Sequence, residues 1–324
     1  SDVYKRQTFD STNSIGQDSP QSTSFNLDSL MSFLLRNILP FWFAGNLLMA
    51  SALNAEVPRI VSIGGSITEI VYALGRGEWV VGRDTSSYYP DDVKAIPTVG
   101  YVRQLNPEGI LSLRPSLVIG PEGLNPPTIV SQLQDAEVQV ELLSKAESCE
   151  DTKTSIRSLG KILNTETSAS ALLQILENDL SLLAKALEPR VNLPRKRALM
   201  LYVRGNRSQF ILGRGSGPSR MLEIAGAENV GDQVDGVKPI TAEAMVALQP
   251  EVLIFFQKGV ASIGGIEKLD ELPGVSFTPA GKQRRFVIMD DLYLAGYGPR
   301  CGKAALDLFK GIHQETGVFI AGTE

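Results

Sequence analysis

A tyrosine and an arginine separated by one residue are the side chains of this sequence best suited to chemistry. They lie in the segment Gly100-Tyr101-Val102-Arg103-Gln104. The 324 residues contain one histidine and two cysteines, so soft metal ligands are scarce, whereas a phenol oxygen suits ferric iron. In an extended segment, residues two apart point to the same side, so Arg103 is expected beside the Tyr101 oxygen, where it favours the phenolate. The alternative is a half-buried loop tyrosine that bonds the backbone, with the arginine in solvent.

The remaining chemical signals are weaker. The segment 213–217 reads Gly-Arg-Gly-Ser-Gly and resembles a phosphate loop, but it lacks the Gly-Lys-Ser/Thr ending, so we interpret it as a flexible turn. Cys149 and Cys301 are far apart in sequence, and we predict two free thiols, with a disulfide as the alternative. His313 falls at the end of a predicted helix, remote from the loops. No CxxC, HExxH, Walker or GxSxG pattern occurs, which argues against an enzyme.

Composition narrows the class of protein. Hydrophobic residues make up 43% and charged residues 21% of the sequence, as in a soluble globular protein. The net charge of −5 argues against nucleic acid as a partner, because nucleic acid calls for a basic surface.

The first 55 residues do not resemble part of a fold. Residues 1–30 are rich in Ser, Gln, Asn and Asp, which predicts a disordered or spurious leader. Residues 31–55 contain one arginine, a short apolar run and a small-residue exit, which together predict a secretory signal peptide. A membrane anchor is the alternative, but the apolar run is shorter than the roughly 20 residues of a spanning helix. We therefore expect the mature protein to begin near Glu56 and to be exported to the periplasm.

An internal repeat predicts two similar lobes. Residues 105–119 and 240–254 share the same order of polar cap, short helix, proline and apolar strand. Asn106 and Thr241 are the predicted helix caps. Two copies of one helix–strand unit indicate two related lobes.

Hydrophobic periodicity predicts alternating strands and helices around the repeat. Strands are expected over residues 59–64, 80–82, 138–143, 197–203 and 286–289, and helices over 66–74, 127–136, 168–188 and 302–313. The predicted class is α/β, with two similar lobes of mainly parallel central sheets, one long connecting α-helix and a ligand cleft between the lobes. The expected boundaries are 56–165 for the first lobe, 166–190 for the linking helix and 195–324 for the second lobe.

Several segments together resemble the periplasmic haem-binding proteins of Gram-negative haem importers, which belong to the helical-backbone class of substrate-binding proteins. The matching segments are 59–75, 82–87, 97–103, 105–115 and 278–282. They extend over nearly all of the expected mature chain, and Gly-Tyr-Val-Arg at 100–103 is specific to the haem branch.

The resemblance implies that Tyr101 ligates the iron of haem b and that Arg103 supports its oxygen. Some family members supply a histidine at the end of the first strand of the second lobe, where this chain has Arg204. A five-coordinate ferric haem is therefore expected. Arg204 or Arg207 is expected to pair with a haem propionate, since the guanidinium fork matches a carboxylate.

Three more tyrosines and two acids complete the expected site. Tyr88 and Tyr89 are rivals for the iron, and we interpret them as cleft-wall or stacking residues; Tyr297 is expected on the opposite side of the cleft. The resemblance also implies delivery to an inner-membrane ABC permease with a cytoplasmic ATPase. Glu69 and Glu223 are the candidate docking acids, and the protein is expected to be a monomer.

A different ligand on the same fold is the second interpretation. The wider superfamily includes ferric-siderophore and cobalamin carriers, which share the opening strand and helix but not the tyrosine motif. A haem-using or metal-dependent hydrolase is a third interpretation, and a structural or adhesive role is the weakest.

Overall fold

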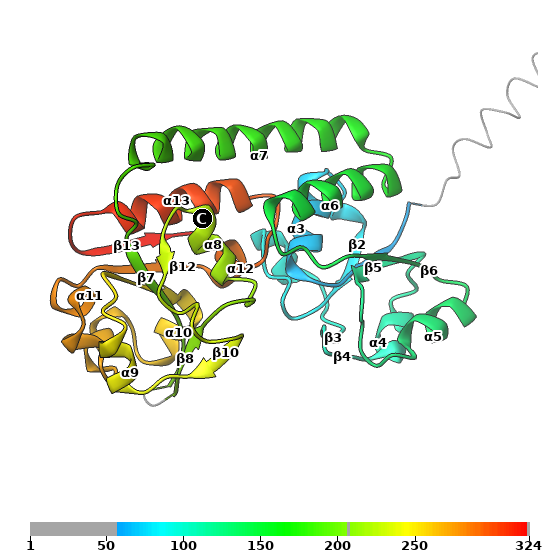
Figure 1. The fold of residues 1–324 in the computed structure, drawn as a ribbon. Helices are drawn as coiled ribbons and strands as arrows, with labels where there is room; N and C mark the ends of the chain where they lie inside the picture. The colour runs from blue at the N-terminus through cyan, green and yellow to red at the C-terminus, as the bar shows by residue number, and fades with distance from the viewer. Residues whose placement is uncertain (1–56, 206–207, 323–324) are drawn as a thin grey trace, which may run out of the picture. The chain divides into compact units, whose positions relative to one another are not determined.

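The structure is a computed structural model that describes residues 57–205 and 208–322. The chain divides into two units, residues 1–56 and 57–324, and the second unit carries the α/β fold (Figure 1). The expected leader and signal peptide therefore lie outside the described residues. Within the described ranges, no helix combines the length and the hydropathy that a membrane span requires.

The first lobe is built on four parallel strands in the order β2-β1-β5-β6. The central strands β1 and β5 are continuous apolar runs because helices cover both faces of the sheet. The elements of this lobe are β1 (Ile60–Ser62), α3 (Gly65–Ala73), β2 (Val80–Arg83), β3 (Gly100–Tyr101), β4 (Gln104–Leu105), α4 (Pro107–Ser112), β5 (Leu117–Pro121), α5 (Ile129–Asp135), β6 (Gln139–Leu143) and α6 (Cys149–Ile162).

The second lobe contains a mixed sheet in the order β10-β8-β7-β11-β12-β13, with β9 also paired to β7. The neighbouring strands β7, β11, β12 and β13 are parallel. Strands β8 and β10 add an antiparallel edge that was not predicted from the sequence. The elements are β7 (Arg197–Arg204), β8 (Ser208–Leu212), α8 (Ser219–Ile224), β9 (Glu228–Asn229), β10 (Val237–Pro239), α9 (Ala242–Ala247), β11 (Val252–Phe256), α10 (Gln257–Ser262), α11 (Pro279–Lys282), β12 (Phe286–Met289), α12 (Asp291–Ala295), α13 (Cys301–His313) and β13 (Val318–Ala321).

The predicted repeat is confirmed in detail. Asn106 caps α4 and Thr241 caps α9, each through a side-chain oxygen that accepts a backbone N–H, at 3.1 and 3.2 Å. The residues before the two prolines, Arg114 and Gln249, have φ angles of 48° and 46°. Few residues other than glycine adopt the left-handed region. The shared conformation therefore supports a common helix–strand unit in the two lobes.

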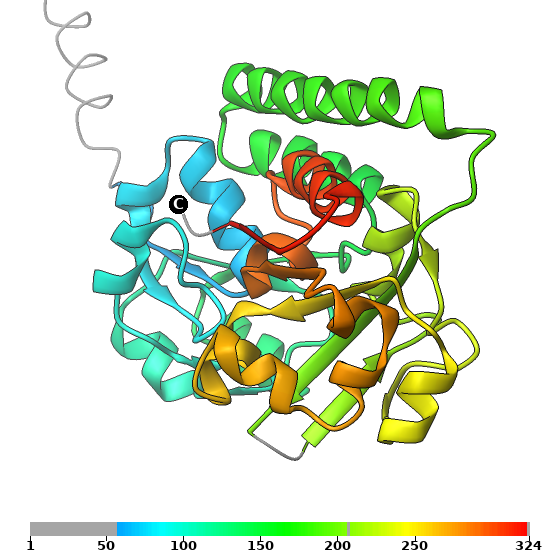
Figure 2. The ribbon, with the colours of Figure 1, turned by 90° about the vertical axis from the view of Figure 1, so that its left-hand side faces the viewer.

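The long helix α7 (Glu166–Leu187) joins the lobes and packs over α6 and α13 (Figure 1 and Figure 2). One apolar cluster runs from Ile60 in β1 through Leu176 in α7 to Met289 in β12. Each lobe has a second, smaller cluster of its own, around Val118 in the first lobe and Phe255 in the second. The predicted two-lobed α/β fold with a long joining helix is confirmed, and the lobes share a core beneath that helix.

His313, the one histidine of the chain, is tied into the last helix. Its Nδ1 lies 2.9 Å from the carbonyl oxygen of Phe309, and the centroids of the His313 and Phe309 rings are 4.3 Å apart. Burial lowers the pKa of His313, and the charges of Arg190 and Lys196 act in the same direction. The folded protein therefore favours the neutral ring.

This lowered pKa predicts a loss of stability in mild acid. As the pH falls below about 6.5, the unfolded chain takes up a proton before the folded chain does, so the free energy of unfolding decreases until the folded pKa is passed. Because the ring is only half-buried, we expect a loss on the order of 1 kcal/mol or less. Urea unfolding at pH 7.5 and 5.5 would measure it, and His313→Gln should show a smaller difference. Equal differences in the two proteins would contradict this assignment.

Candidate ligand-binding cleft between the lobes

Tyr101 lies on a short hairpin. Strands β3 and β4 pair antiparallel, with Tyr101 opposite Gln104, so Val102 and Arg103 form a two-residue turn. Gly100 has a φ of 110°, and a Cβ at this position would lie 2.8 Å from the Gln104 carbonyl oxygen, so the hairpin requires glycine there. The expected extended segment is therefore wrong at residues 102–103. The chain reverses at that point, and strand alternation does not place Arg103 beside the phenol.

The Tyr101 side chain is available to a ligand. It is 47% exposed, and its hydroxyl has no hydrogen-bond partner among the residues that the structure describes. The hairpin beneath it is anchored, because Gly100 O accepts the Thr85 N–H at 2.9 Å and the Leu105 N–H donates to Asn125 O at 3.0 Å. The alternative of a backbone-bonded phenol is thus not found in the described part of the chain. An exposed phenol on an anchored turn is suited to bind an external group.

A cavity of about 380 Å³ lies between the lobes beside this hairpin. Its first-lobe wall comes from the carboxyl ends of β1, β5 and β6 and from Arg103, and its second-lobe wall from residues 295–297. Ligands of α/β sheets commonly bind at the carboxyl ends of parallel strands. In Figure 1, β3 and β4 lie on the side of the first lobe that is turned toward β8 and β10.

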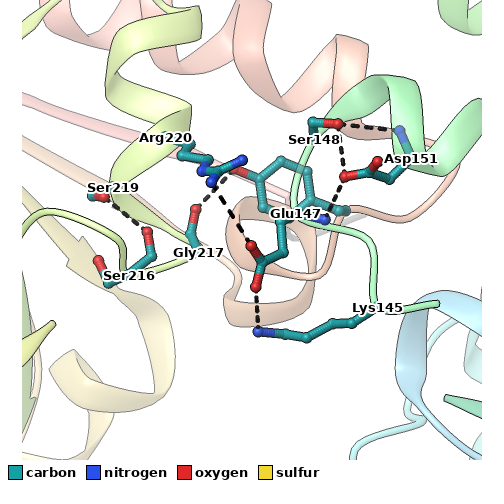
Figure 3. Close-up of polar contacts among 9 residues, drawn as sticks. Lys145, Glu147, Ser148, Asp151, Ser216, Gly217, Ser219 and Arg220 are labelled. Carbon is teal, nitrogen blue, oxygen red and sulfur yellow. Dashed lines mark hydrogen bonds and ion pairs between the residues drawn. The ribbon is translucent and has the colours of Figure 1, made fainter. Parts of the chain in front are cut away.

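At the rim of this cavity, charged residues of the first lobe lie close to a charged residue of the second lobe (Figure 3). Glu147, which follows β6, lies 2.9 Å from the Lys145 ammonium and 3.9 Å from the guanidinium of Arg220 on α8. The hydrogen bond from Lys145 lowers the pKa of Glu147. The side chains are substantially exposed, so each pair is weak in energy. Glu147 therefore faces two cations, one from each lobe.

The Gly-Arg-Gly-Ser-Gly segment contacts Tyr297, which lines the second-lobe wall of the cavity. Ser216 Oγ donates to Gly213 O at 2.8 Å, and Ser219 Oγ donates to Ser216 O at 2.8 Å. Figure 3 shows these serines beside Gly217, whose carbonyl oxygen accepts the Tyr297 hydroxyl at 2.8 Å. The segment closes a turn through its own hydrogen bonds and leads into α8.

Tyr88 holds the lobes together and does not line the cavity. Its hydroxyl donates to the Asp290 carboxylate at 3.0 Å and accepts the Leu292 N–H at 2.8 Å, and the Lys258 ammonium lies 3.4 Å from its ring centroid. Burial and the Asp290 charge raise the pKa of Tyr88, so its phenol stays protonated. This corrects its expected place as a rival iron ligand or cleft-wall residue.

Tyr89 lies away from its expected place, whereas Tyr297 lies on the second-lobe wall of the cleft, as expected. Tyr89 lies against Arg300, whose guanidinium carbon is 3.6 Å from the ring centroid, and it lines a different cavity beneath α7. Tyr297 reaches the wall of the cleft, but it is 1% exposed and its hydroxyl is bonded to Gly217 O. The Tyr89 ring is therefore covered by Arg300 outside this cavity, and the bonded hydroxyl of Tyr297 offers no free phenol to a ligand.

Glu69 is not a surface acid, which corrects its expected role in docking. It is 4% exposed and forms a two-point ion pair with Arg300, with Nη2 3.2 Å from Oε2. Burial raises the pKa of Glu69, and the Arg300 hydrogen bond opposes that effect. Glu223, at the end of α8, is exposed and stays a candidate.

An aromatic group at the end of β7 was not predicted from the sequence. Tyr202 is 38% exposed, and its ring centroid lies 6.3 Å from those of both Phe210 and Phe256. Arg204, the last residue of β7, is also exposed and lies two residues further along the strand. Arg207 lies outside the described residues. Strand alternation along β7 could have predicted that Tyr202 and Arg204 lie on the same face. It could not have predicted the aromatic partners of Tyr202, which come from other strands.

No cluster of three or more His, Cys, Asp or Glu side chains able to hold a metal ion occurs in the part of the chain that the structure describes. The exposed phenol of Tyr101 is a candidate ligand for a hard cation that brings its other ligands with it.

Comparison with known proteins identifies the class. The periplasmic binding protein family matches residues 60–293, more than half of the chain, so the chain belongs to this family. It is similar to the structure of the periplasmic heme-binding protein RhuT from Roseiflexus sp. RS-1 in apo form, with 39% identity and a TM-score of 0.74. The match covers 80% of this chain and 98% of that chain. The fold and family that the sequence predicted are thereby confirmed.

Two sequence relatives place the chain among transport proteins. It is 28% identical over 266 residues to an uncharacterized ABC transporter substrate-binding lipoprotein, YvrC, from Bacillus subtilis, with 82% of each chain covered. It is 25% identical over 215 residues to a vitamin B12-binding protein from Pectobacterium atrosepticum, covering 66% of this chain and 76% of that protein. The chain is a substrate-binding protein of the ABC-transporter type and not an enzyme.

Proposed function

We propose that this protein captures ferric haem b in the cleft between its lobes, with Tyr101 as the iron ligand. The observation that carries the proposal is the exposed, unbonded phenol of Tyr101 on an anchored hairpin beside the inter-lobe cavity. The similarity to a structure described as a periplasmic heme-binding protein supports the same ligand. A tyrosinate is a hard anionic ligand that stabilises ferric iron.

Residues of both lobes suit a flat apolar ligand with two carboxylates. The aromatic group of Tyr202 and Phe210 offers apolar surface at the carboxyl end of β7. Arg103 lines the cavity, and Arg204 or Arg207 would pair with propionates, since the guanidinium fork matches a carboxylate. A single iron–protein bond also suits a carrier that must release its cargo.

The proposed cycle ends at a membrane. The loaded protein, exported to the periplasm by its N-terminal signal peptide, would act as a monomer and deliver haem to an inner-membrane ABC permease with a cytoplasmic ATPase. Membership in a family of ABC-transport binding proteins supports such a partner. Glu223 is the remaining candidate acid for contact with permease arginines, since Glu69 is buried.

A cobalamin or ferric-siderophore carrier is the second candidate function. The similarity to a vitamin B12-binding protein favours cobalamin. That protein is less similar in sequence to this chain than the heme-binding structure is. Cobalt in cyanocobalamin has both axial positions filled as well as its ring nitrogens, so such a carrier would not depend on the Tyr101 oxygen.

Titration with hemin and with cyanocobalamin separates the two functions. We expect a saturable change of the hemin Soret band with a Kd of roughly 1 μM or tighter, and no saturable change with cyanocobalamin. Iron-free protoporphyrin IX is the matched control, and it should bind more weakly because it offers no metal to the phenol. Saturable binding of cyanocobalamin without binding of hemin would establish the second candidate instead.

A further inference from the structure

The two cysteines meet at the contact between the lobes. Cys149 is the first residue of α6 in the first lobe, and Cys301 is the first residue of α13 in the second. Their side chains are 5% and 1% exposed and belong to the same apolar cluster. The two helices are in contact, and the Cys149 side chain lies close enough to raise the pKa of the Cys301 thiol. Both are free thiols in the structure.

The surroundings of both cysteines are fixed by one hydrogen bond between distant segments and one within a turn. Thr152, one turn beyond Cys149 on α6, donates its hydroxyl to Tyr297 O at 2.7 Å, shortly before Cys301. The Cys301 N–H donates to Gly298 O at 3.0 Å and closes the turn that leads into α13. The two helix starts are thus joined by a hydrogen bond that does not involve sulfur, and the two cysteines are brought near each other as a consequence.

We propose that Cys149 and Cys301 form a disulfide that joins α6 to α13 when the chain folds in an oxidising environment. The oxidant is a small or protein disulfide. A thiolate of one cysteine attacks a sulfur of that disulfide and releases its first thiol; the second cysteine then attacks the mixed disulfide and releases the other thiol. The two cysteines lose two electrons and two protons, and the oxidant gains both as two thiols.

The oxidation is expected during folding and not in the finished protein. The hydrogen bond with Cys149, together with burial, raises the pKa of Cys301, so little thiolate forms in the folded state. Exchange also needs access to the sulfur, which both thiols lack once α13 has packed. A chain that folds reduced should therefore keep its thiols for a long time.

The bond would connect the lobes on the face covered by α7, away from Tyr101. Because it closes a loop that includes α7 and most of the second lobe, it restricts the unfolded chain strongly. The folded protein would gain stability, and the two helix starts could no longer separate. This inference is independent of which ligand occupies the cleft.

Refolding under two redox conditions tests the proposal. The denatured, reduced protein is refolded either with oxidised glutathione or with excess reduced glutathione, and each product is analysed by non-reducing peptide mapping and thermal unfolding. We expect a peptide linked through Cys149 and Cys301 in the first product only, with a Tm raised by about 5–10 °C. The folded reduced protein, treated with the same oxidant, should keep both thiols.

The variant carrying Cys149→Ala and Cys301→Ala is the control, and its Tm should not depend on the redox condition. If that variant fails to fold, the linked peptide and the Tm of the wild-type protein still decide the question. Two glutathione adducts in place of the linked peptide would overturn the proposal. So would a linked peptide without any rise in Tm, since the bond would then not fit the folded structure.

Discussion

Hemin affinity should fall by about 100-fold when Tyr101 is replaced by alanine, because the proposed iron ligand and its ring are both lost. Tyr101 is an exposed phenol on the hairpin whose turn lines the inter-lobe cavity, and the described residues offer its oxygen no competing bond. Loss of a single iron–oxygen bond should change the spectrum as well as the affinity. A ferric tyrosinate absorption in the wild-type complex should be absent from the complex of Tyr101→Ala.

Phenylalanine at the same position isolates the oxygen. Tyr101→Phe keeps the ring and should lose the tyrosinate absorption, with a smaller loss of affinity than Tyr101→Ala. Tyr202→Phe is the matched control, because it removes a phenol oxygen from another exposed tyrosine on the second lobe and should leave the spectrum unchanged. A wild-type spectrum in Tyr101→Phe would refute the ligand assignment while leaving haem binding itself intact.

Replacing Glu69 with alanine should lower the free energy of unfolding by about 3–5 kcal/mol, because it leaves the Arg300 guanidinium buried without its partner. Arg300 lies between the rings of Tyr89 and Tyr293, with its guanidinium carbon 3.6 and 4.8 Å from their centroids. It therefore cannot turn to water without breaking these contacts. Urea unfolding of wild type and Glu69→Ala would measure the difference.

Two further variants test whether the loss of stability comes from leaving Arg300 buried without its partner and not merely from removing a negative charge. Glu69→Gln keeps hydrogen-bonding atoms beside Arg300 and should cost less than Glu69→Ala. Asp91→Asn removes a carboxylate from the exposed pair with Lys94, whose side chains are 89% and 59% exposed, and should change stability by less than about 1 kcal/mol. If Glu69→Ala were as mild as Asp91→Asn, the ion pair would not hold the lobes together.

Local signals explain why much of the fold could be predicted. The caps Asn106 and Thr241 and the prolines after α4 and α9 mark element ends within a few residues, so both copies of the repeat were recognised. The antiparallel strands β8 and β10 were missed, since pairing between strands is a tertiary property that short apolar runs do not specify.

The site was harder to predict, because its residues are placed by partners remote in sequence. The positions of Tyr88 and Glu69 depend on Asp290 and Arg300, which lie more than 200 residues away. The hairpin of Tyr101 turns at Val102-Arg103, a dipeptide without the glycine or asparagine that usually marks a two-residue turn. The tyrosine motif could be recognised from sequence, whereas its geometry could not.

The core shared beneath α7 has a consequence for how the protein is made. Residues of β1 and α6 bury their apolar side chains in the same cluster as residues of α13, the last helix of the chain. A ribosome synthesises the first lobe long before that helix. The growing polypeptide therefore lacks its largest core until synthesis is almost complete, which would keep it loosely structured and suited to translocation across a membrane in an unfolded form.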